Sequence, residues 1–147
     1  MSAVGFFGGT FNPVHIGHLR AALDCLDALN LDQIALLPAA SPPLKEAPLV
    51  AAKQRAEMLQ LAVTGTAGLT VDCRELGRPG LSYTADTLAE LRSEYPKDTS
   101  ITFVIGMDSL INLNQWHEWP RLFDLANIAI MARPGVSLTL DSDVKRA

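Results

Sequence analysis

The chain of 147 residues has 12 basic and 16 acidic side chains, so its formal net charge is −4. This balance disfavours a protein that coats nucleic acid, no apolar run is long enough to cross a bilayer, and we expect neither a nucleic-acid nor a membrane partner. Cys25 and Cys73 lie far apart and form no CxxC motif, which argues against a disulfide framework or a structural zinc site. The start of the chain has no basic segment, and it is more typical of an internal strand than of a signal peptide.

Short apolar runs alternate with longer segments of helical period, which predicts a parallel sheet covered by helices. Right-handed crossovers then favour an α/β fold with a Rossmann-like, doubly wound parallel sheet flanked by helices. In the first helix, the spacing predicts an apolar stripe of Leu19, Leu23, Leu26 and Leu29. We expect strands near residues 3–8, 33–37, 69–73, 101–105 and 127–132, and helices near 14–29, 51–63, 84–94, 119–125 and, as a short turn, after Asp108.

Two glycines, Gly8 and Gly9, stand where the first predicted strand gives way to the first helix. Glycines at such a junction let backbone N–H groups approach an anion, and the helix N-terminus adds the positive end of its dipole. Asn12 is typical of a helix cap, and Pro13 is typical of the first helical position. The junction therefore predicts a phosphate site.

Two histidines, His15 and His18, follow this junction at a spacing of three, which favours one face of a helix. Imidazole titrates near neutrality, so a phosphate chain would hold either ring protonated and accept charge-assisted hydrogen bonds. Two solvated histidines on a surface helix are the alternative, but the glycine pair and the cap favour the phosphate site. A zinc site would lack a third ligand.

Three basic residues elsewhere stand in sequence patterns that indicate phosphate binding less strongly. Lys45 stands in the proline-punctuated loop 38–48, where a mobile point charge suits a phosphate, although a single Lys is usually solvated. Arg133 follows the last predicted strand, where it would either grip phosphates bidentately or lie on a surface turn. Arg55, on the second predicted helix, is most simply a residue of a solvated face.

Four residues in the second half of the chain stand at positions typical of a helix cap or of a core. Asp108, just past an apolar strand, is typical of a helix cap, and Thr84 is expected to cap the third long helix after a loop. Trp116 and Trp119 are, by sequence alone, more typical of a core.

The segment Gly9-Thr10-Phe11-Asn12-Pro13-Val14-His15-Ile16-Gly17-His18 resembles the GTFDPxHxGH-like motif of the nucleotidylyltransferases. Four later motifs narrow the resemblance to the bacterial nicotinate-nucleotide adenylyltransferases: Pro42-Pro43-Leu44-Lys45, Ser82-Tyr83-Thr84, Gly106-Met107-Asp108 and Trp116-His117-Glu118-Trp119. The resemblance implies transfer of AMP from ATP to nicotinate mononucleotide, which gives nicotinic acid adenine dinucleotide and pyrophosphate in NAD biosynthesis. It also implies a cytoplasmic enzyme that uses Mg²⁺, bound mainly by ATP and by no protein ligand, and it leaves homo-oligomerisation open.

The same resemblance assigns roles to residues. It implies that His15 and His18 are catalytic, that Trp116 stacks on the pyridine ring, and that Thr84 meets the nicotinate carboxylate with its backbone and hydroxyl, while Trp119 remains a core residue. Lys45, Thr84 and Trp116 would bind the nicotinate mononucleotide. The ATP site would comprise Gly8, Gly9, Thr10, Phe11, His15, His18, Gly106, Asp108 and Arg133.

We expect residues 1–147 to form a single nucleotidylyltransferase domain that lacks the family's C-terminal segment, a Ser/Thr-rich run ending in Ile-Arg. Two other interpretations follow from this length. One is a phosphopantetheine adenylyltransferase, which the Trp116 segment and the motif at 82–84 argue against. The other is a noncatalytic nucleotide-binding module or fragment.

Overall fold

The computed structural model describes residues 2–9, 11, 14, 16–38, 52–76, 83–106 and 118–131.

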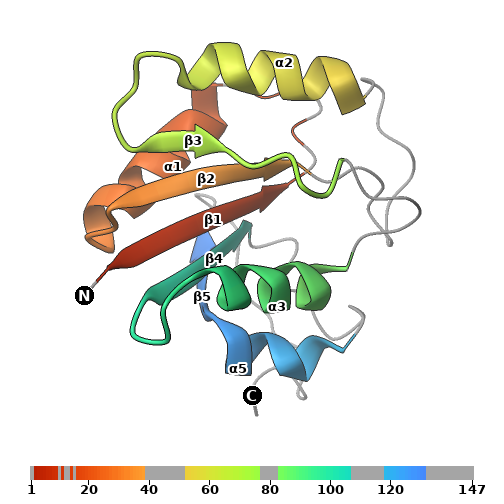
Figure 1. The fold of residues 1–147 in the computed structure, drawn as a ribbon. Helices are drawn as coiled ribbons and strands as arrows, with labels where there is room; N and C mark the ends of the chain where they lie inside the picture. The colour runs from red at the N-terminus through yellow and green to blue at the C-terminus, as the bar shows by residue number, and fades with distance from the viewer. Residues whose placement is uncertain are drawn as a thin grey trace.

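A parallel sheet of five strands forms the centre of the described structure (Figure 1). Its spatial order is β3-β2-β1-β4-β5, and register pairs such as Gly5 with Ile34 and Gly5 with Thr102 place β1 between β2 and β4. The chain therefore winds outward from β1 in one direction and from β4 in the other, which confirms the predicted doubly wound topology. The strands are β1 (Ala3–Gly9), β2 (Gln33–Pro38), β3 (Leu69–Val71), β4 (Ser100–Gly106) and β5 (Asn127–Met131).

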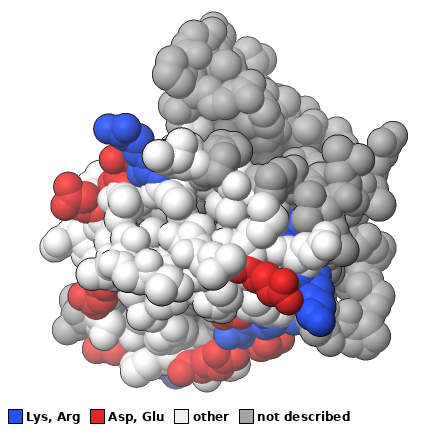
Figure 2. Space-filling model, turned by 90° about the horizontal axis from the view of Figure 1, so that it is seen from above, with Lys and Arg blue, Asp and Glu red and all other residues white. Residues whose placement is uncertain are grey.

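Helices cover both faces of this sheet. α1 and α2 pack on one face, where Leu36, Leu59 and Val104 are buried together. α3 and α5 pack on the other, where Phe103 and Leu88 are buried. The helices are α1 (Ile16–Ala28), α2 (Ala52–Val63), α3 (Thr84–Glu94), the 3-10 helix η2 (Trp119–Arg121) and α5 (Leu122–Leu125). Seen over α2, the charged side chains lie towards the margin of the described surface, around an uncharged centre (Figure 2).

The predicted elements that fall within the described residues are confirmed in type and order, and two boundaries differ by two residues. Val14 lies outside the helix and α1 begins at Ile16, so the prediction that the helix starts at Asn12 and Pro13 was wrong. The chain first turns at Phe11, which has φ of +49° and is buried, before it can enter the helix. β3 ends at Val71 because Asp72 turns its carboxylate back to the N–H of Arg74, at 3.0 Å.

The predicted leucine stripe of α1 was wrong in part. Leu23 and Leu29 are exposed, and the residues that α1 buries fully are Ala22 and Cys25. Small side chains let the helix axis approach the sheet closely, and the Cys25 thiol contacts the Met131 sulfur of β5 at 3.0 Å. Leu19 and Leu26 are partly buried beside them.

No helix among the described residues is long and apolar enough to cross a membrane.

Candidate active site

The carboxyl ends of β1 and β4 define the candidate site, because the winding of the sheet reverses between these two strands. In open α/β sheets, ligands bind in the crevice outside the strand ends at this reversal. The last register pair of the two strands is Phe7 with Val104. Two residues beyond that pair, β1 ends in Gly9 and β4 ends in Gly106. Both strand ends therefore offer bare backbone to the crevice.

The three glycines at the strand ends, Gly8, Gly9 and Gly106, have different surroundings. A Cβ on Gly8 would lie 2.7 Å from Cζ of Phe103, and a Cβ on Gly9 would lie 3.3 Å from Cζ of Phe11. The absence of these side chains thus makes room for two buried aromatic rings. A Cβ on Gly106 meets no heavy atom of the described residues within 4 Å. Packing explains Gly8 and Gly9, whereas Gly106 faces open space beside the crevice.

His18 is held by aromatic rings in the first turn of α1. Its imidazole is partly buried and meets Phe11 edge to face, with ring centroids 5.0 Å apart. Phe11 in turn meets Phe7 of β1 at 5.6 Å, so the row of three rings ties the helix start to the end of β1. A buried residue at φ of +49° stores backbone strain, which persists only where surrounding packing enforces it. Phe11 thereby orients the imidazole beside the glycine-ended strand.

The N-terminus of α3 has no side-chain cap hydrogen bond from its N-cap residue. Tyr83 is the N-cap residue, in an extended conformation and without a side-chain cap hydrogen bond, and Thr84 is the first helical residue. The prediction that Thr84 caps this helix was therefore wrong. The N–H groups of a first helical turn have no partner within the helix, and the dipole there favours negative charge. This end of α3 can bind an anionic group.

Arg55 lies in the first turn of α2 and is only 1% exposed, so the prediction of a solvated face was wrong. Leu59 and Val63, four and eight residues further on, are also buried, so the arginine occupies the buried stripe of the helix. Burial lowers the pKa of its guanidinium, which nevertheless interacts with other groups. α2 runs from the end of β2 back to the start of β3, which places Arg55 towards the carboxyl edge of the sheet.

A cluster of charged residues joins the turn after β3 to α3. The Arg74 guanidinium pairs with Asp72 at 2.9 Å, Glu90 at 3.0 Å and Glu94 at 2.7 Å. The hydrogen bond from Arg74 lowers the pKa of Glu94, and the bond to Glu94 raises the pKa of Arg74. Because the Glu94 pKa is lowered on folding, its stabilising contribution is present above the unfolded-state pKa and is lost as the pH falls through the folded-state pKa.

A second contact beside this cluster is buried. The Thr87 hydroxyl donates to Oε2 of Glu75 at 2.8 Å, and both side chains are almost completely enclosed. No sequence motif had indicated a role for Arg74 or Glu75. The helical spacing of Thr87, Glu90 and Glu94 along α3 is the signal that could have indicated a common face for these partners.

The described residues include six of the predicted site residues and one predicted core residue. Gly8, Gly9, Phe11 and His18 lie together at the end of β1, Gly106 ends the neighbouring strand, and Thr84 begins α3. Trp119 packs partly buried against the core, as predicted. The predictions for Thr10, His15, Lys45, Asp108, Trp116 and Arg133, and for the helical turn after Asp108, lie outside the described residues.

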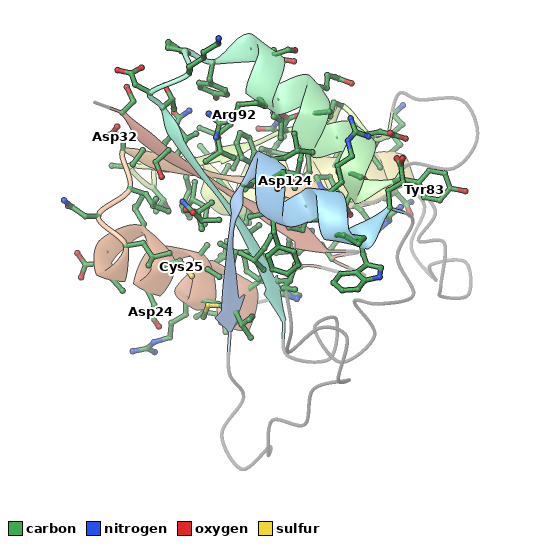
Figure 3. All side chains as sticks on the ribbon, turned by 90° about the horizontal axis from the view of Figure 1, so that it is seen from below. Asp24, Cys25, Asp32, Tyr83, Arg92 and Asp124 are labelled. Carbon is green, nitrogen blue, oxygen red and sulfur yellow. The ribbon has the colours of Figure 1, made fainter. Side chains whose placement is uncertain are left out.

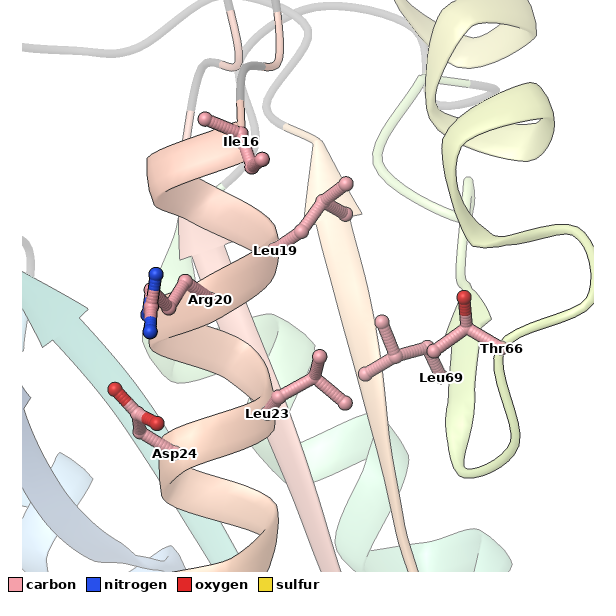
Figure 4. Close-up of a pocket in the computed structure, with 7 residues that line it drawn as sticks. All are labelled: Ile16, Leu19, Arg20, Leu23, Asp24, Thr66 and Leu69. Atoms are coloured by element: carbon pink, nitrogen blue, oxygen red, sulfur yellow. The ribbon is translucent and has the colours of Figure 1, made fainter.

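A separate groove of about 470 Å³ lies between α1 and the start of β3 (Figure 4). Ile16, Leu19, Leu23 and Leu69 form most of its lining. Its polar side chains are Arg20, Asp24 and Thr66. It therefore offers hydrophobic contact, and its lining contains no histidine or cysteine.

The described part of the chain contains no group of three His, Cys, Asp or Glu residues that could hold a metal ion.

These features define a Rossmann-like α/β protein, a class in which ligands bind outside the strand ends where the winding reverses, here between β1 and β4. A family model described as cytidylyltransferase-like matches residues 6–146, and the chain belongs to this family.

Two curated relatives are named probable nicotinate-nucleotide adenylyltransferase. The protein from Chromohalobacter salexigens is 48% identical over 131 residues, which are 89% of this chain and 60% of that protein. The one from Aeromonas salmonicida is 49% identical over 132 residues, 90% of this chain and 61% of the relative. This chain therefore spans about three fifths of the length of these relatives.

Solved structures show the same fold at low sequence identity. The nicotinic acid mononucleotide adenylyltransferase of Plasmodium falciparum complexed with NaAD has a TM-score of 0.78 and 15% identity, covering 99% of this chain and 71% of that one. A putative nicotinate-nucleotide adenylyltransferase from Vibrio parahaemolyticus has a TM-score of 0.73 and 18% identity, covering 99% of this chain and 80% of that one. The predicted Rossmann-like fold is confirmed.

Proposed function

We propose that the protein transfers AMP from ATP to nicotinate mononucleotide in NAD biosynthesis. A phosphate oxygen of the mononucleotide forms a bond to the α-phosphorus of ATP, the bond from that phosphorus to the bridging oxygen breaks, and pyrophosphate leaves. The observation that supports this most is the 48% identity to a probable nicotinate-nucleotide adenylyltransferase over 89% of this chain. We further propose that residues 1–147 belong to one nucleotidylyltransferase domain of a cytoplasmic enzyme, for which the free thiols Cys25 and Cys73 are suited.

The reaction needs little proton chemistry from the protein. A phosphate monoester is largely dianionic near neutral pH, so the attacking oxygen requires no general base. Catalysis then rests on positioning and on stabilising the charge of the triphosphate. In this proposal His15 and His18 donate to phosphate oxygens, and the ends of β1 and β4 approach the nucleotide through Gly9 and Gly106. Gly8, Thr10, Phe11, Asp108 and Arg133 complete the proposed ATP site.

The acceptor would lie at the other side of the crevice, at the N-terminus of α3. The first turn at Thr84 suits the nicotinate carboxylate, because the N–H groups of a first helical turn have no partner within the helix and the dipole there favours negative charge. Lys45 and Trp116 would contact the phosphate and the pyridine ring. These assignments follow from the motifs that contain the residues.

We infer that Mg²⁺ accompanies ATP. In this proposal the ion is held by substrate oxygens and water. When bound, such an ion neutralises part of the triphosphate charge.

Pyrophosphate release in the presence of ATP, Mg²⁺ and nicotinate mononucleotide tests the proposal. We expect turnover with nicotinate mononucleotide, and a kcat/KM at least about tenfold lower with nicotinamide mononucleotide, because the amide forfeits a charge-assisted hydrogen bond at α3. Equal rates with both acceptors would remove the carboxylate contact from the proposal. Turnover with 4′-phosphopantetheine instead would favour the phosphopantetheine enzyme, and ATP binding without pyrophosphate release would favour a noncatalytic module.

Substitution of two glycines separates packing from nucleotide contact. Gly8→Ala would push against the buried Phe103 ring, and we expect the free energy of unfolding to fall by about 1–3 kcal/mol. Gly106→Ala has open space for its methyl group, so we expect stability within about 0.5 kcal/mol of the wild type. If the nucleotide lies against β4, that methyl group crowds it. We then expect the KM for ATP to rise about tenfold, which corresponds to a loss of about 1.4 kcal/mol of binding free energy. Urea denaturation and initial rates measure both, and an unchanged KM for ATP would take Gly106 out of the site.

A further inference from the structure

Five side chains fix the turn after β3 to α3, and we name them the turn clamp: Asp72, Arg74, Glu75, Thr87 and Glu94. Arg74 lies at its centre. Its Nε donates to both oxygens of Asp72 at 3.0 Å, and its two terminal nitrogens donate to the two oxygens of Glu94 at 2.7 and 3.0 Å. A planar guanidinium that binds two carboxylates in forked geometry fixes orientation as well as distance.

Glu75 and Thr87 close the clamp nearer to the start of the helix. Thr87 is fully buried, and its hydroxyl donates to the Glu75 carboxylate at 2.8 Å. Its backbone N–H donates to the carbonyl of Tyr83 at 3.1 Å, which closes the first turn of α3. The residue that binds Glu75 is therefore the same residue whose N–H holds Tyr83, the neighbour of Thr84.

The clamp runs along α3, from Thr87 in its first turn to Glu94, its last residue, and a second arginine holds the last turns as well. Arg92 donates to the carbonyl of Thr99 at 2.7 Å and to that of Leu125 at 3.3 Å, which ties the end of the helix to β4 and α5. Figure 3 shows Tyr83 and Arg92 towards opposite ends of α3. Two arginines thus hold the last turns of one helix, and they differ in how they bind. Arg92 donates to carbonyl oxygens, which accept over a broad range of directions, whereas Arg74 binds carboxylates in forked geometry.

We propose that Arg74, Glu75 and Thr87 are positioning residues, which hold the N-terminus of α3 at the distance and angle that the nicotinate mononucleotide requires. The inference rests on the proposed function, because Thr84 at that helix end is the proposed carboxylate contact. Burial of Ala85, Leu88 and Leu91 holds α3 on the sheet, but the hydrophobic effect is non-directional and specifies the position along the helix axis less sharply. The forked ion pairs and the buried hydroxyl oppose that sliding, since each has a narrow range of favourable geometry.

The test compares Arg74→Ala with Arg92→Ala as its matched control, on the same helix. We expect Arg74→Ala to raise the KM for nicotinate mononucleotide about tenfold and to change the KM for ATP less than about twofold, since a tenfold change corresponds to one displaced polar contact. Arg92→Ala is expected to lower the denaturation midpoint and to leave both KM values within about twofold. Arg74→Lys is expected to restore only part of the affinity, because an ammonium cannot bind two carboxylates in forked geometry.

Thr87→Val provides a second variant that keeps the shape of the buried side chain. It removes the hydroxyl donor to Glu75, and we expect the same selective rise in the KM for nicotinate mononucleotide. Equal rises in both KM values, or unchanged KM values in folded Arg74→Ala and Thr87→Val proteins, would overturn the positioning role. Absence of turnover by the wild-type chain would instead contradict the proposed function, and with it the substrate that the clamp serves.

Discussion

His18→Phe is expected to lower kcat about 100- to 1,000-fold, the effect of removing one donor to the charge that develops during reaction. Phenylalanine keeps a ring of similar size against Phe11, whose centroid lies 5.0 Å from that of His18. The free energy of unfolding should therefore change by less than about 1 kcal/mol. Steady-state pyrophosphate release and urea denaturation of the same preparation measure both quantities.

Two companion variants define what this result means. His18→Ala removes the ring as well as its nitrogens, so we expect the same loss of turnover with an added loss of about 0.5–1.5 kcal/mol of stability. Arg20→Gln removes an exposed cation two residues after His18 in α1. We expect it to leave kcat within about twofold of the wild-type value. Undiminished turnover by folded His18→Phe would show that the imidazole only packs, and the phosphate role would then be wrong.

The sheet was predictable because apolar runs of strand length leave few alternatives once helices separate them. β4, for example, is buried from Ile101 to Ile105, and its sequence contains no charged residue. Parallel pairing and right-handed crossovers then place Gly9 and Gly106 at one edge, so the position of the crevice followed from topology. The exact start of α1 could not be predicted from the sequence, because the turn at Phe11 depends on how its ring packs against Phe7.

Side-chain partners across the sheet were not predictable from periodicity. In α1, the positions of Leu19, Leu23 and Leu26 and those of Ala22 and Cys25 both have helical spacing, and contact with the sheet selected the smaller residues. Likewise nothing local to Arg74 indicates that its partners lie 16 and 20 residues further on. Such contacts depend on how far each element slides against its neighbour.

Arg55→Ala is expected to lower the free energy of unfolding by about 3–5 kcal/mol, the largest stability effect of any substitution considered. The side chain is 1% exposed, so its removal leaves a cavity between α2 and the sheet and deprives the groups it interacts with of their charged partner. Lys53→Ala removes the same charge from an exposed position in the same helical turn and should change stability by less than about 0.5 kcal/mol. Urea denaturation of both variants measures the difference. Because burial disfavours the charged form of Arg55, the cation persists only where other groups offset that cost, and equal stability of the two variants would show that its interactions contribute nothing to stability.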